Sequence, residues 1–233
     1  MLANRVADET IYNNFDFYET PKEYFSLVLD AIQNELTSPA SVLDIGCANG
    51  AFLNHVNKKF PGSILNGIEP ISALADIARE NLVNANISCG DLFNIDSIKQ
   101  VQCSPAVSLL GVMGIFFDPS KVVERLLEVT DNGGAVFIFS PFNEEPVDVI
   151  LNYRHAPDGE WESGHNLFSM QTMESICSSL GVSFRWVDFS MSRSIPKHND
   201  PMRSWTEPFR GKDHHLIYGT NMFSTMKLLV IRK

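Results

Sequence analysis

The sequence predicts an α/β fold: a doubly wound, mostly parallel sheet of seven strands, with helices on both faces and an antiparallel last strand. Short apolar runs alternate with segments of helical periodicity over residues 41–140, an order that is typical of parallel sheets with right-handed crossovers. One run, AVSLLGV at 106–112, is hydrophobic almost throughout, which suits a central strand covered on both faces.

Size and composition favour one domain over residues 1–233. The chain is 44% hydrophobic and long enough to bury a full core. We expect no secretory signal, because the N-terminus lacks an apolar run, and the apolar stretch at 106–117 is too short to cross a bilayer. No cysteines have CxxC spacing, which indicates reduced, buried thiols in a cytoplasmic protein. The four are Cys47, Cys89, Cys103 and Cys177.

Each element up to residue 140 has its own signal. Strands are predicted at 41–46, 64–69, 86–91, 106–112 and 135–140, and helices at 51–60, 71–82 and 118–130. The last of these helices has Asp118 as a candidate N-cap and Pro119 at its first helical position, and it stops at Asn132-Gly133-Gly134.

The alternation stops after Ser140. Residues 141–168 show no clear period, and the segment 191–221 is predicted to be a long loop of the kind that usually has a function. The first forty residues are predicted to form helices over one end of the sheet. The remaining predicted elements are a helix at 170–180, capped by Ser169, and strands at 183–190 and 222–233.

The net charge of −10 argues against polyanion binding by the whole surface. Acidic residues outnumber basic ones up to residue 150, whereas residues 151–233 are slightly basic and hold five of the six histidines. The basic excess therefore falls on the segments that follow the predicted parallel strands.

The loop after the first predicted strand, Gly46 to Gly50, lies where open parallel sheets bind ligands. Its glycines allow close approach of backbone to a ligand. A dinucleotide fold prefers GxGxxG, and this chain has Gly46, Ala48 and Ala51 at those positions. No Gly-Lys-Ser/Thr follows, which excludes a phosphate-binding P-loop.

Asp44 decides between the remaining ligands. A carboxylate two residues before Gly46 would repel a pyrophosphate and favours a cation or a hydrogen-bond donor. Glu69 ends the next strand, where it can accept hydrogen bonds from both hydroxyls of a ribose. Asp91 ends the third strand, where it can accept from the exocyclic amine of an adenine.

The four motifs are Asp44-x-Gly46-x-x-x-Gly50, Glu69-Pro70, Gly90-Asp91 and Leu127…Asp131-Asn132-Gly133-Gly134. In this order they resemble the motifs of the class I, Rossmann-like S-adenosylmethionine-dependent methyltransferases, over roughly residues 40–140. The resemblance implies S-adenosyl-L-methionine as methyl donor and S-adenosyl-L-homocysteine as product. Ala48 stands where the family more often has glycine, and it needs only a conformation that an L-residue can adopt.

The resemblance also implies a role for each motif residue. The implied donor-binding residues are Asp44, Gly46, Cys47, Ala48 and Gly50 for the methionine moiety, Glu69, Pro70 and Ile71 for the ribose and adenine, Gly90, Asp91 and Leu92 for the adenine edge, and Leu110 and Gly111 for the amino-acid part. On this basis the chain divides into an N-terminal helical cap (1–40), a cofactor-binding core (41–140) and substrate-side loops at 141–168 and 191–221.

A general base is not identified by the usual motif. Methyl transfer from a sulfonium mainly requires alignment, and a base matters only where the acceptor must lose a proton. Many members of the family carry Glu-His just after the fourth strand, whereas this chain reads Gly114-Ile115-Phe116-Phe117 before Asp118-Pro119. The catalytic candidates therefore come from the first substrate-side loop. They are His165, His155 and Tyr153.

The acceptor is predicted to be anionic, because basic residues exceed acidic ones from 185 to 212. Arg193, Lys197 and Arg203 are expected to meet a phosphate, a carboxylate or a nucleotide-linked sugar. The full set of substrate-binding candidates is Arg154, Trp161, Arg193, Lys197, His198 and Arg203. No metal site is expected at His214-His215, because adjacent side chains in an extended segment point in opposite directions.

The expected function is O-methylation of a sugar or glycan precursor. The alternatives are N-methylation of an amine or amino-acid derivative, a non-catalytic methyltransferase-like binding subunit, and RNA or protein methylation. A NAD-dependent oxidoreductase is disfavoured because its pyrophosphate would meet Asp44. The expected partner is a small-molecule acceptor, with no nucleic acid and no membrane, and a homodimer is left open.

Overall fold

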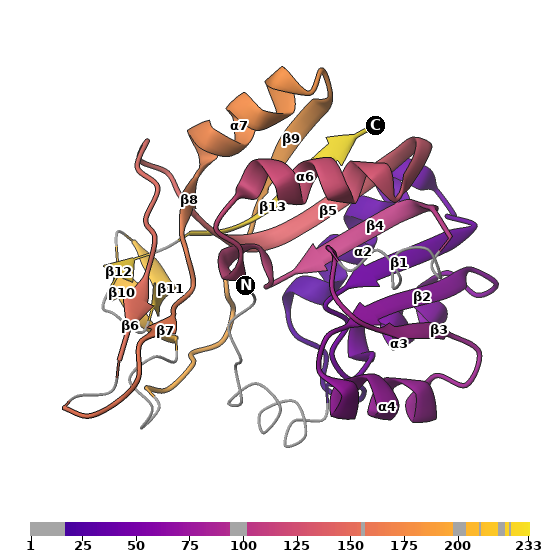
Figure 1. Cartoon of the computed structure of the whole chain (residues 1–233), viewed down its shortest axis with the longest axis horizontal. Coiled ribbons are helices and arrows are strands. Elements are labelled where there is room, and N and C mark those ends of the chain that lie inside the picture. Colours follow the sequence, from indigo (N-terminus) through magenta and orange to yellow (C-terminus); the bar gives the residue numbers. More distant parts are fainter. Residues whose placement is uncertain are drawn as a thin grey trace.

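The computed structural model describes residues 17–93, 102–154, 157–197, 204–209, 211–218, 222–223 and 225–233. Figure 1 shows a mixed α/β molecule built on one large twisted sheet. The helices are α2 (Tyr24–Leu36), α3 (Ala51–Lys59), α4 (Ser72–Asn81), the 3₁₀ turn η1 (Met113–Ile115), α6 (Pro119–Glu128) and α7 (Met170–Ser179).

The strands of the large sheet are β1 (Ser41–Ile45), β2 (Ile64–Glu69), β3 (Asn86–Cys89), β4 (Ser104–Leu110), β5 (Thr130–Asn143), β8 (Phe168–Ser169), β9 (Ser183–Asp188) and β13 (Thr225–Arg232). The short strands outside it are β6 (Asn152–Tyr153), β7 (Glu162–Ser163), β10 (Trp205–Phe209), β11 (Lys212–Tyr218) and β12 (Met222–Phe223).

The order of the large sheet is β3-β2-β1-β4-β5-β13-β9, with the short β8 also paired to β5. Strands β1 to β5 pair in parallel, and β13 is antiparallel to both of its neighbours. The predicted fold class, with seven main strands and an antiparallel last one, is therefore confirmed. All five parallel strands end at the same edge of the sheet, and that edge carries the candidate site (Figure 1).

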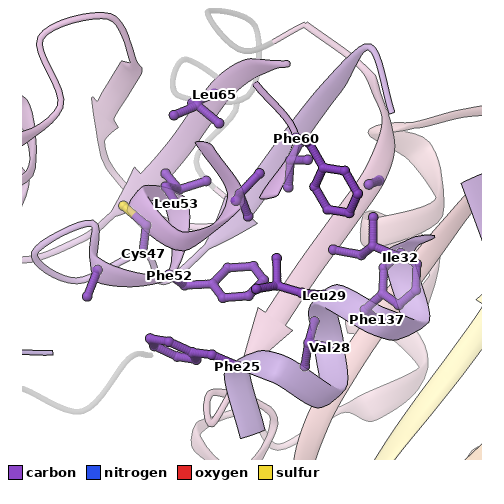
Figure 2. Packing of buried hydrophobic residues seen from close by; sticks show 14 of the residues in the cluster. Phe25, Val28, Leu29, Ile32, Cys47, Phe52, Leu53, Phe60, Leu65 and Phe137 are labelled. Carbon is purple, nitrogen blue, oxygen red and sulfur yellow. The ribbon is translucent and has the colours of Figure 1, made fainter. Parts of the chain in front are cut away.

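Two clusters of buried side chains cover the two faces of the sheet. One lies between the sheet and α2, α3 and α4, and the other between the sheet and α6 and α7. Figure 2 shows the first cluster, in which Phe25 of α2 meets Phe52 of α3 with ring centroids 5.3 Å apart. Burial of such aromatic rings contributes about 2 kcal/mol or more for each side chain.

The N-terminal helix was predicted to cover one end of the sheet, and this is wrong for α2. The helix lies on a face, where Val28 and Ile32 are fully buried and Tyr24 stacks on Phe139 of β5 at 4.2 Å between ring centroids. Residues 1–16 of the predicted helical cap fall outside the described residues.

Several predicted boundaries needed correction. The strand predicted at 86–91 ends at Cys89, and the one predicted at 106–112 spans Ser104–Leu110. Asp118 is the N-cap of α6, as predicted, and its side chain accepts a hydrogen bond from the Lys121 amide. That helix ends at Glu128, because the chain turns directly into β5 at Thr130.

The segments predicted to be irregular contain strands. Residues 191–221 were predicted to be a long loop, yet β10 and β11 form an antiparallel pair there, with β12 added to it. The strand predicted at 222–233 is accordingly split, because Met222–Phe223 pairs with β11 and only Thr225–Arg232 joins the large sheet. The aperiodic segment 141–168 likewise contains the β6–β7 pair.

All four cysteines are free thiols, as predicted. Cys47 and Cys177 are buried, whereas Cys89 and Cys103 are exposed, which corrects the prediction that all are buried. None of the helices in the described part of the chain is long and apolar enough to cross a membrane.

Candidate donor and acceptor site

The glycine loop reverses the chain between β1 and α3. Gly46 and Gly50 have φ values of +77° and +86°, which L side chains rarely adopt. The amides of Gly46 and Cys47 both donate to the carbonyl of Ile68, at 2.8 and 3.1 Å, so the loop is fixed to the end of β2. A Cβ on Gly46 would lie 2.7 Å from a methyl carbon of Val112, and this close contact places the loop against the segment after β4.

Ala48 departs from its prediction. Its φ of +47° lies in the left-handed region, which costs a residue with a Cβ about 1–2 kcal/mol. A hydrogen bond offsets part of this strain, because the Ala48 amide donates to Oε2 of Glu69 at 2.9 Å. Glycine would suit this position better.

Asp44 is buried beneath the loop, with 3% of its surface exposed. Its Oδ1 accepts a hydrogen bond of 2.7 Å from the hydroxyl of Ser108, which lies opposite it on β4. Burial raises the pKa of the Asp44 carboxyl from 3.8 to about 7; the Ser108 hydrogen bond and the charge of Lys22 lower it, and Glu69 raises it. A cation entering beside Asp44 would restore its ionised form.

Glu69 is also buried, with 4% exposed, at the end of β2. Its two oxygens accept from the backbone amides of Ala48 and Ile71, both at 2.9 Å. The side chain thus joins the glycine loop to the residue that caps α4. Its role toward a ribose stays a prediction, as do the roles of Pro70 and Ile71.

The residues predicted to read an adenine edge follow β3. The Gly90 amide donates to the carbonyl of Glu69 at 3.0 Å, and Oδ1 of Asp91 accepts from the Phe93 amide at 2.8 Å. The side chain of Leu92 is buried in the second core cluster. Their roles toward adenine stay predictions.

A small cavity of about 30 Å³ connects Asp44 with the end of β4. It is lined by Asp44, Cys47 and Ala48, by Leu110 and by the aromatic residues Phe17 and Tyr24. Gly111, next after Leu110, has a φ of +75°, and its amide donates to the carbonyl of Phe139 at 2.7 Å. A buried carboxylate, a bare loop and an adjoining strand end fit the amino-acid end of the donor that the resemblance implies.

The segment after β4 meets the loop 141–168 through Gly114. A Cβ at Gly114 would lie 3.3 Å from both Cβ and Nδ1 of His165, so the histidine packs directly over this glycine. Asn166, which is buried, fixes this contact. Its backbone amide donates to the Gly114 carbonyl at 2.6 Å, and its side-chain Nδ2 donates to the Phe116 carbonyl at 2.7 Å. The structure therefore brings a histidine to the turn where the family motif would have supplied one.

The other two catalytic candidates are Tyr153 and His155. Tyr153 lies on β6, paired with Glu162. His155 lies outside the described residues. His214 and His215 are consecutive on β11, and His215 contacts the ring of Phe209. The described residues include no group of three or more His, Cys, Asp or Glu side chains placed to hold a metal ion.

The predicted substrate-binding residues have different partners within the chain. Arg154 lies over the exposed ring of Trp161 at 5.3 Å, and Lys197 lies over Trp205 at 4.7 Å. Arg193 pairs with Glu23, with 3.3 Å between Nε and Oε1. His198 and Arg203 lie outside the described residues. The anionic-acceptor hypothesis thus has only Arg193 and Lys197 to be judged on.

Arg193 lines a larger cleft of about 600 Å³ between the start of α2 and the segment after β9. This volume is typical of small-molecule sites. Phe189 and Ser190 contribute from the β9 side, and Lys22 and Asp30 from the α2 side. Lys22 also lines the small cavity at Asp44, so the two spaces adjoin at this lysine.

Sequence reasoning missed three residues of this arrangement: Lys22, Ser108 and Asn166. Ser108 had a visible signal, since it is the one polar side chain in the run 106–112. Its partner was not visible, because the pairing of β4 with β1 is not adjacent in sequence.

The chain matches a family profile described as "Methyltransferase domain" over residues 17–183. It is 26% identical to the carboxy-S-adenosyl-L-methionine synthase of Campylobacter fetus subsp. fetus (strain 82-40). The alignment spans 165 residues and covers 65% of this chain and 67% of that protein. It is 19% identical over 206 residues to the malonyl-[acyl-carrier protein] O-methyltransferase of Priestia megaterium (strain DSM 319 / IMG 1521), covering 83% of this chain and 74% of that protein.

The fold resembles an amino pentose methyltransferase from Micromonospora echinaspora, whose structure was solved with S-adenosylmethionine bound. The TM-score is 0.58 at 14% identity, over 97% of this chain and 96% of that chain. At this identity the likeness supports the fold alone.

Proposed function

We propose, from the premise that this chain belongs to the methyltransferase-domain family, that it O-methylates a sugar or a glycan precursor. Membership in the family confirms the predicted enzyme class, an S-adenosylmethionine-dependent methyltransferase, and with it the predicted methyl donor. The acceptor, the acceptor atom and the residues that serve them form the proposal.

One juxtaposition carries the proposal. Gly46 of the donor loop lies against Val112, and Gly114, two residues further on, lies against His165. A short stretch of backbone thus separates the donor loop from an imidazole. This arrangement supports His165 as the group beside the acceptor, with the segments 141–168 and 191–221 on the acceptor side.

When bound, S-adenosylmethionine supplies a methyl group that is already activated on a sulfonium. The chain's own contribution is then to align the acceptor and to hold its proton. In our proposal the acceptor oxygen forms the bond to the methyl carbon as the carbon–sulfur bond breaks, and His165 takes the hydroxyl proton. The imidazole is suited to this step because its unperturbed pKa lies near neutrality.

The 600 Å³ cleft is our proposed site for the part of the acceptor that lies away from the reacting hydroxyl and from His165. Phe189 offers an aromatic face, and Ser190 and Ser192 offer polar groups. An anionic part of the acceptor would compete with Glu23 for the guanidinium of Arg193. The choice of a sugar follows the name of one structural relative, an amino pentose methyltransferase, and the labelled-donor assay below tests it. We extend the proposal to a cytoplasmic enzyme, on the ground that its four thiols are free.

One feature of the cleft favours N-methylation of an amine as the second candidate. Glu23, Asp30 and Asp188 all line it, and carboxylates would attract a protonated amine. Each of them already has a basic partner within the chain, namely Arg193, Lys59 and Lys227. The pairing reduces this attraction, so a hydroxyl acceptor remains our first candidate and an amine our second.

The test uses labelled S-adenosylmethionine with sugar phosphates, nucleotide-linked sugars and amines, followed by His165→Gln. We expect transfer to a hydroxylated acceptor and a fall in kcat of about 10²–10⁴-fold in His165→Gln. S-adenosylhomocysteine affinity, measured by calorimetry, should stay within about twofold. His214→Gln is the matched control and should retain full turnover.

Two results would count against the proposal. Tight donor binding without transfer to any acceptor would favour the non-catalytic alternative. Transfer to a hydroxyl that His165→Gln leaves unchanged would remove the histidine from the mechanism but leave the enzyme class intact.

A further inference from the structure

The segment from Phe17 to Lys22 lies across the donor loop. The Tyr18 hydroxyl donates to the carbonyl of Asn49 at 2.6 Å, and burial raises the pKa of Tyr18 to about 12, so this donor keeps its proton. The Phe17 carbonyl lies 3.1 Å from Nε2 of His55 on α3. The backbone before α2 is therefore held against both the glycine loop and helix α3.

Lys22 ends this segment and reaches the cavity that Asp44 lines. Its ammonium lies 4.7 Å from the ring centroid of Phe17 and 5.9 Å from that of Tyr24. Tyr24 is itself stacked on Phe139, with an angle of 20° between the rings. Aromatic faces attract a cation, so they favour one place for the lysine head group.

Side chains of opposite charge line the cavity. Lys22 is the one basic side chain among the described residues that line it, and its charge acts on the Asp44 carboxyl. The amino-acid end of S-adenosylmethionine carries both an ammonium and a carboxylate. Asp44 suits the ammonium, and the carboxylate requires a cation of its own because a buried charge without a partner is costly.

We propose that Lys22 binds the carboxylate of the donor's amino-acid end, opposite the ammonium held by Asp44. This inference rests on the proposed function only in that the donor is S-adenosylmethionine; it does not depend on the acceptor. Lys22 also borders the 600 Å³ cleft, so it separates the donor from the acceptor space.

The test compares ligands that differ only at the amino-acid end. Calorimetry with S-adenosylhomocysteine and with 5′-methylthioadenosine, which lacks that end, is carried out on wild type, Lys22→Met and Lys22→Arg. We expect Lys22→Met to weaken S-adenosylhomocysteine binding about 10- to 100-fold, as for a lost charge-assisted hydrogen bond, and to leave methylthioadenosine within twofold. Lys22→Arg should stay within about threefold for both.

A third ligand isolates the carboxylate. Wild type should prefer S-adenosylmethionine over its decarboxylated form by at least tenfold, and Lys22→Met should lose that preference. Lys58→Met, on the exposed side of α3, removes the same charge elsewhere and should retain it.

Equal losses for S-adenosylhomocysteine and methylthioadenosine would show that Lys22 only supports the fold, and unchanged binding of both would assign it to the acceptor cleft. Either result overturns the inference. If wild type binds S-adenosylhomocysteine but methylates no acceptor, the proposed function fails and this inference stands. If wild type binds none of the three ligands, both fail.

Discussion

Asp44 combines an ionisable carboxyl group with almost complete burial, and a buried charge is costly unless a partner is available. In the absence of a ligand cation, the Ser108 hydroxyl and the nearby Lys22 are what favour its ionised form. In our proposal the buried carboxyl group of Asp44 binds the ammonium of the donor, and its burial does not serve the stability of the fold. Its burial has a measurable consequence in the pH dependence of both folding and binding.

The raised pKa of Asp44 determines whether stability rises or falls with pH. The unfolded chain loses the Asp44 proton near pH 3.8 and the folded one near pH 7, so between these values the folded state binds more protons. The contribution of Asp44 to stability is full below pH 3.8 and is lost as the pH rises to about 7. Because the ammonium prefers the carboxylate, S-adenosylhomocysteine affinity should rise by up to tenfold per pH unit towards about pH 7 and then level off.

Calorimetry from pH 5.5 to 8.5 measures this profile. Ser108→Ala removes a hydrogen bond that lowers the Asp44 pKa, so it should move the midpoint to higher pH. Asp44→Asn should abolish the slope and weaken binding at all pH values. A Ser108→Ala midpoint equal to that of wild type would assign the titration to another group.

The positions of the candidate donor residues at the strand ends were predictable at the residue scale, because their signals are local. Asp44 and Gly46 were identified within one run of sequence, and Glu69 and Asp91 at the ends of the next strands. The left-handed conformation of Ala48 was not predictable, because it is imposed by the hydrogen bond to Glu69, twenty-one residues away. Lys22 was missed for a similar reason, since only the tertiary fold brings it to Asp44.

At the scale of elements, η1 and the loop 141–168 are joined by Asn166. Its side-chain Oδ1 also accepts a hydrogen bond from the Leu151 backbone amide at 3.0 Å. One buried side-chain amide therefore bonds to the backbone of the loop 141–168 and to the backbone that follows η1. His165 owes its position to this residue, because the two are consecutive and both lie against Gly114.

Asn166→Ala should lower the free energy of unfolding by about 2–4 kcal/mol, because it leaves the Leu151 amide and the buried Phe116 carbonyl without their partner. Turnover should fall further than donor affinity, because His165 loses its support. Urea unfolding and calorimetry measure the two effects.

Asn143→Ala is the control for this substitution. Asn143 also makes two side-chain hydrogen bonds to backbone, with Val147 and Glu145, but these are exposed. Water can replace them, and the expected loss is below about 1 kcal/mol. Equal losses in the two variants would contradict the role given to burial at Asn166.

The strands of the segment 191–221 could not be recognised from composition. The run Trp205–Phe209 contains Glu207 and Pro208, and Lys212–Tyr218 begins with four polar residues, so neither alternates cleanly. Gly211, with a φ of +77°, is the turn residue between them and was the available signal. The β1 and β2 strands were predicted closely because apolar runs between turn residues are unambiguous.

At the scale of the whole molecule, our proposal assigns the donor and the acceptor to different segments of chain. The predicted donor residues lie at the ends of β1, β2, β3 and β4, whereas β6, β7 and β10 to β12 lie beyond the edge towards which those strands point (Figure 1). The two parts should therefore be separable by deletion.

Strands β9 and β13 are antiparallel neighbours, with Asp188 opposite Lys227, so a short turn can join them. Replacing residues 191–224 by a four-residue Gly/Asn turn should leave S-adenosylhomocysteine affinity within about threefold and abolish methyl transfer. Calorimetry and the labelled-donor assay measure these outcomes. A loss of donor affinity greater than tenfold would mean that the removed segment completes the donor site.

The position of β13 also affects how the molecule assembles. This strand follows β9 in the chain but lies between β9 and β5 in the sheet, pairing with both along most of its length. Strand β9 therefore cannot pair with the sheet until β13 has paired with β5. The two strands join the edge of the sheet in the reverse of the order in which they are synthesised. Until then, β5 presents an edge of unpaired backbone N–H and C=O groups, flanked by apolar side chains, to any other strand in the cell.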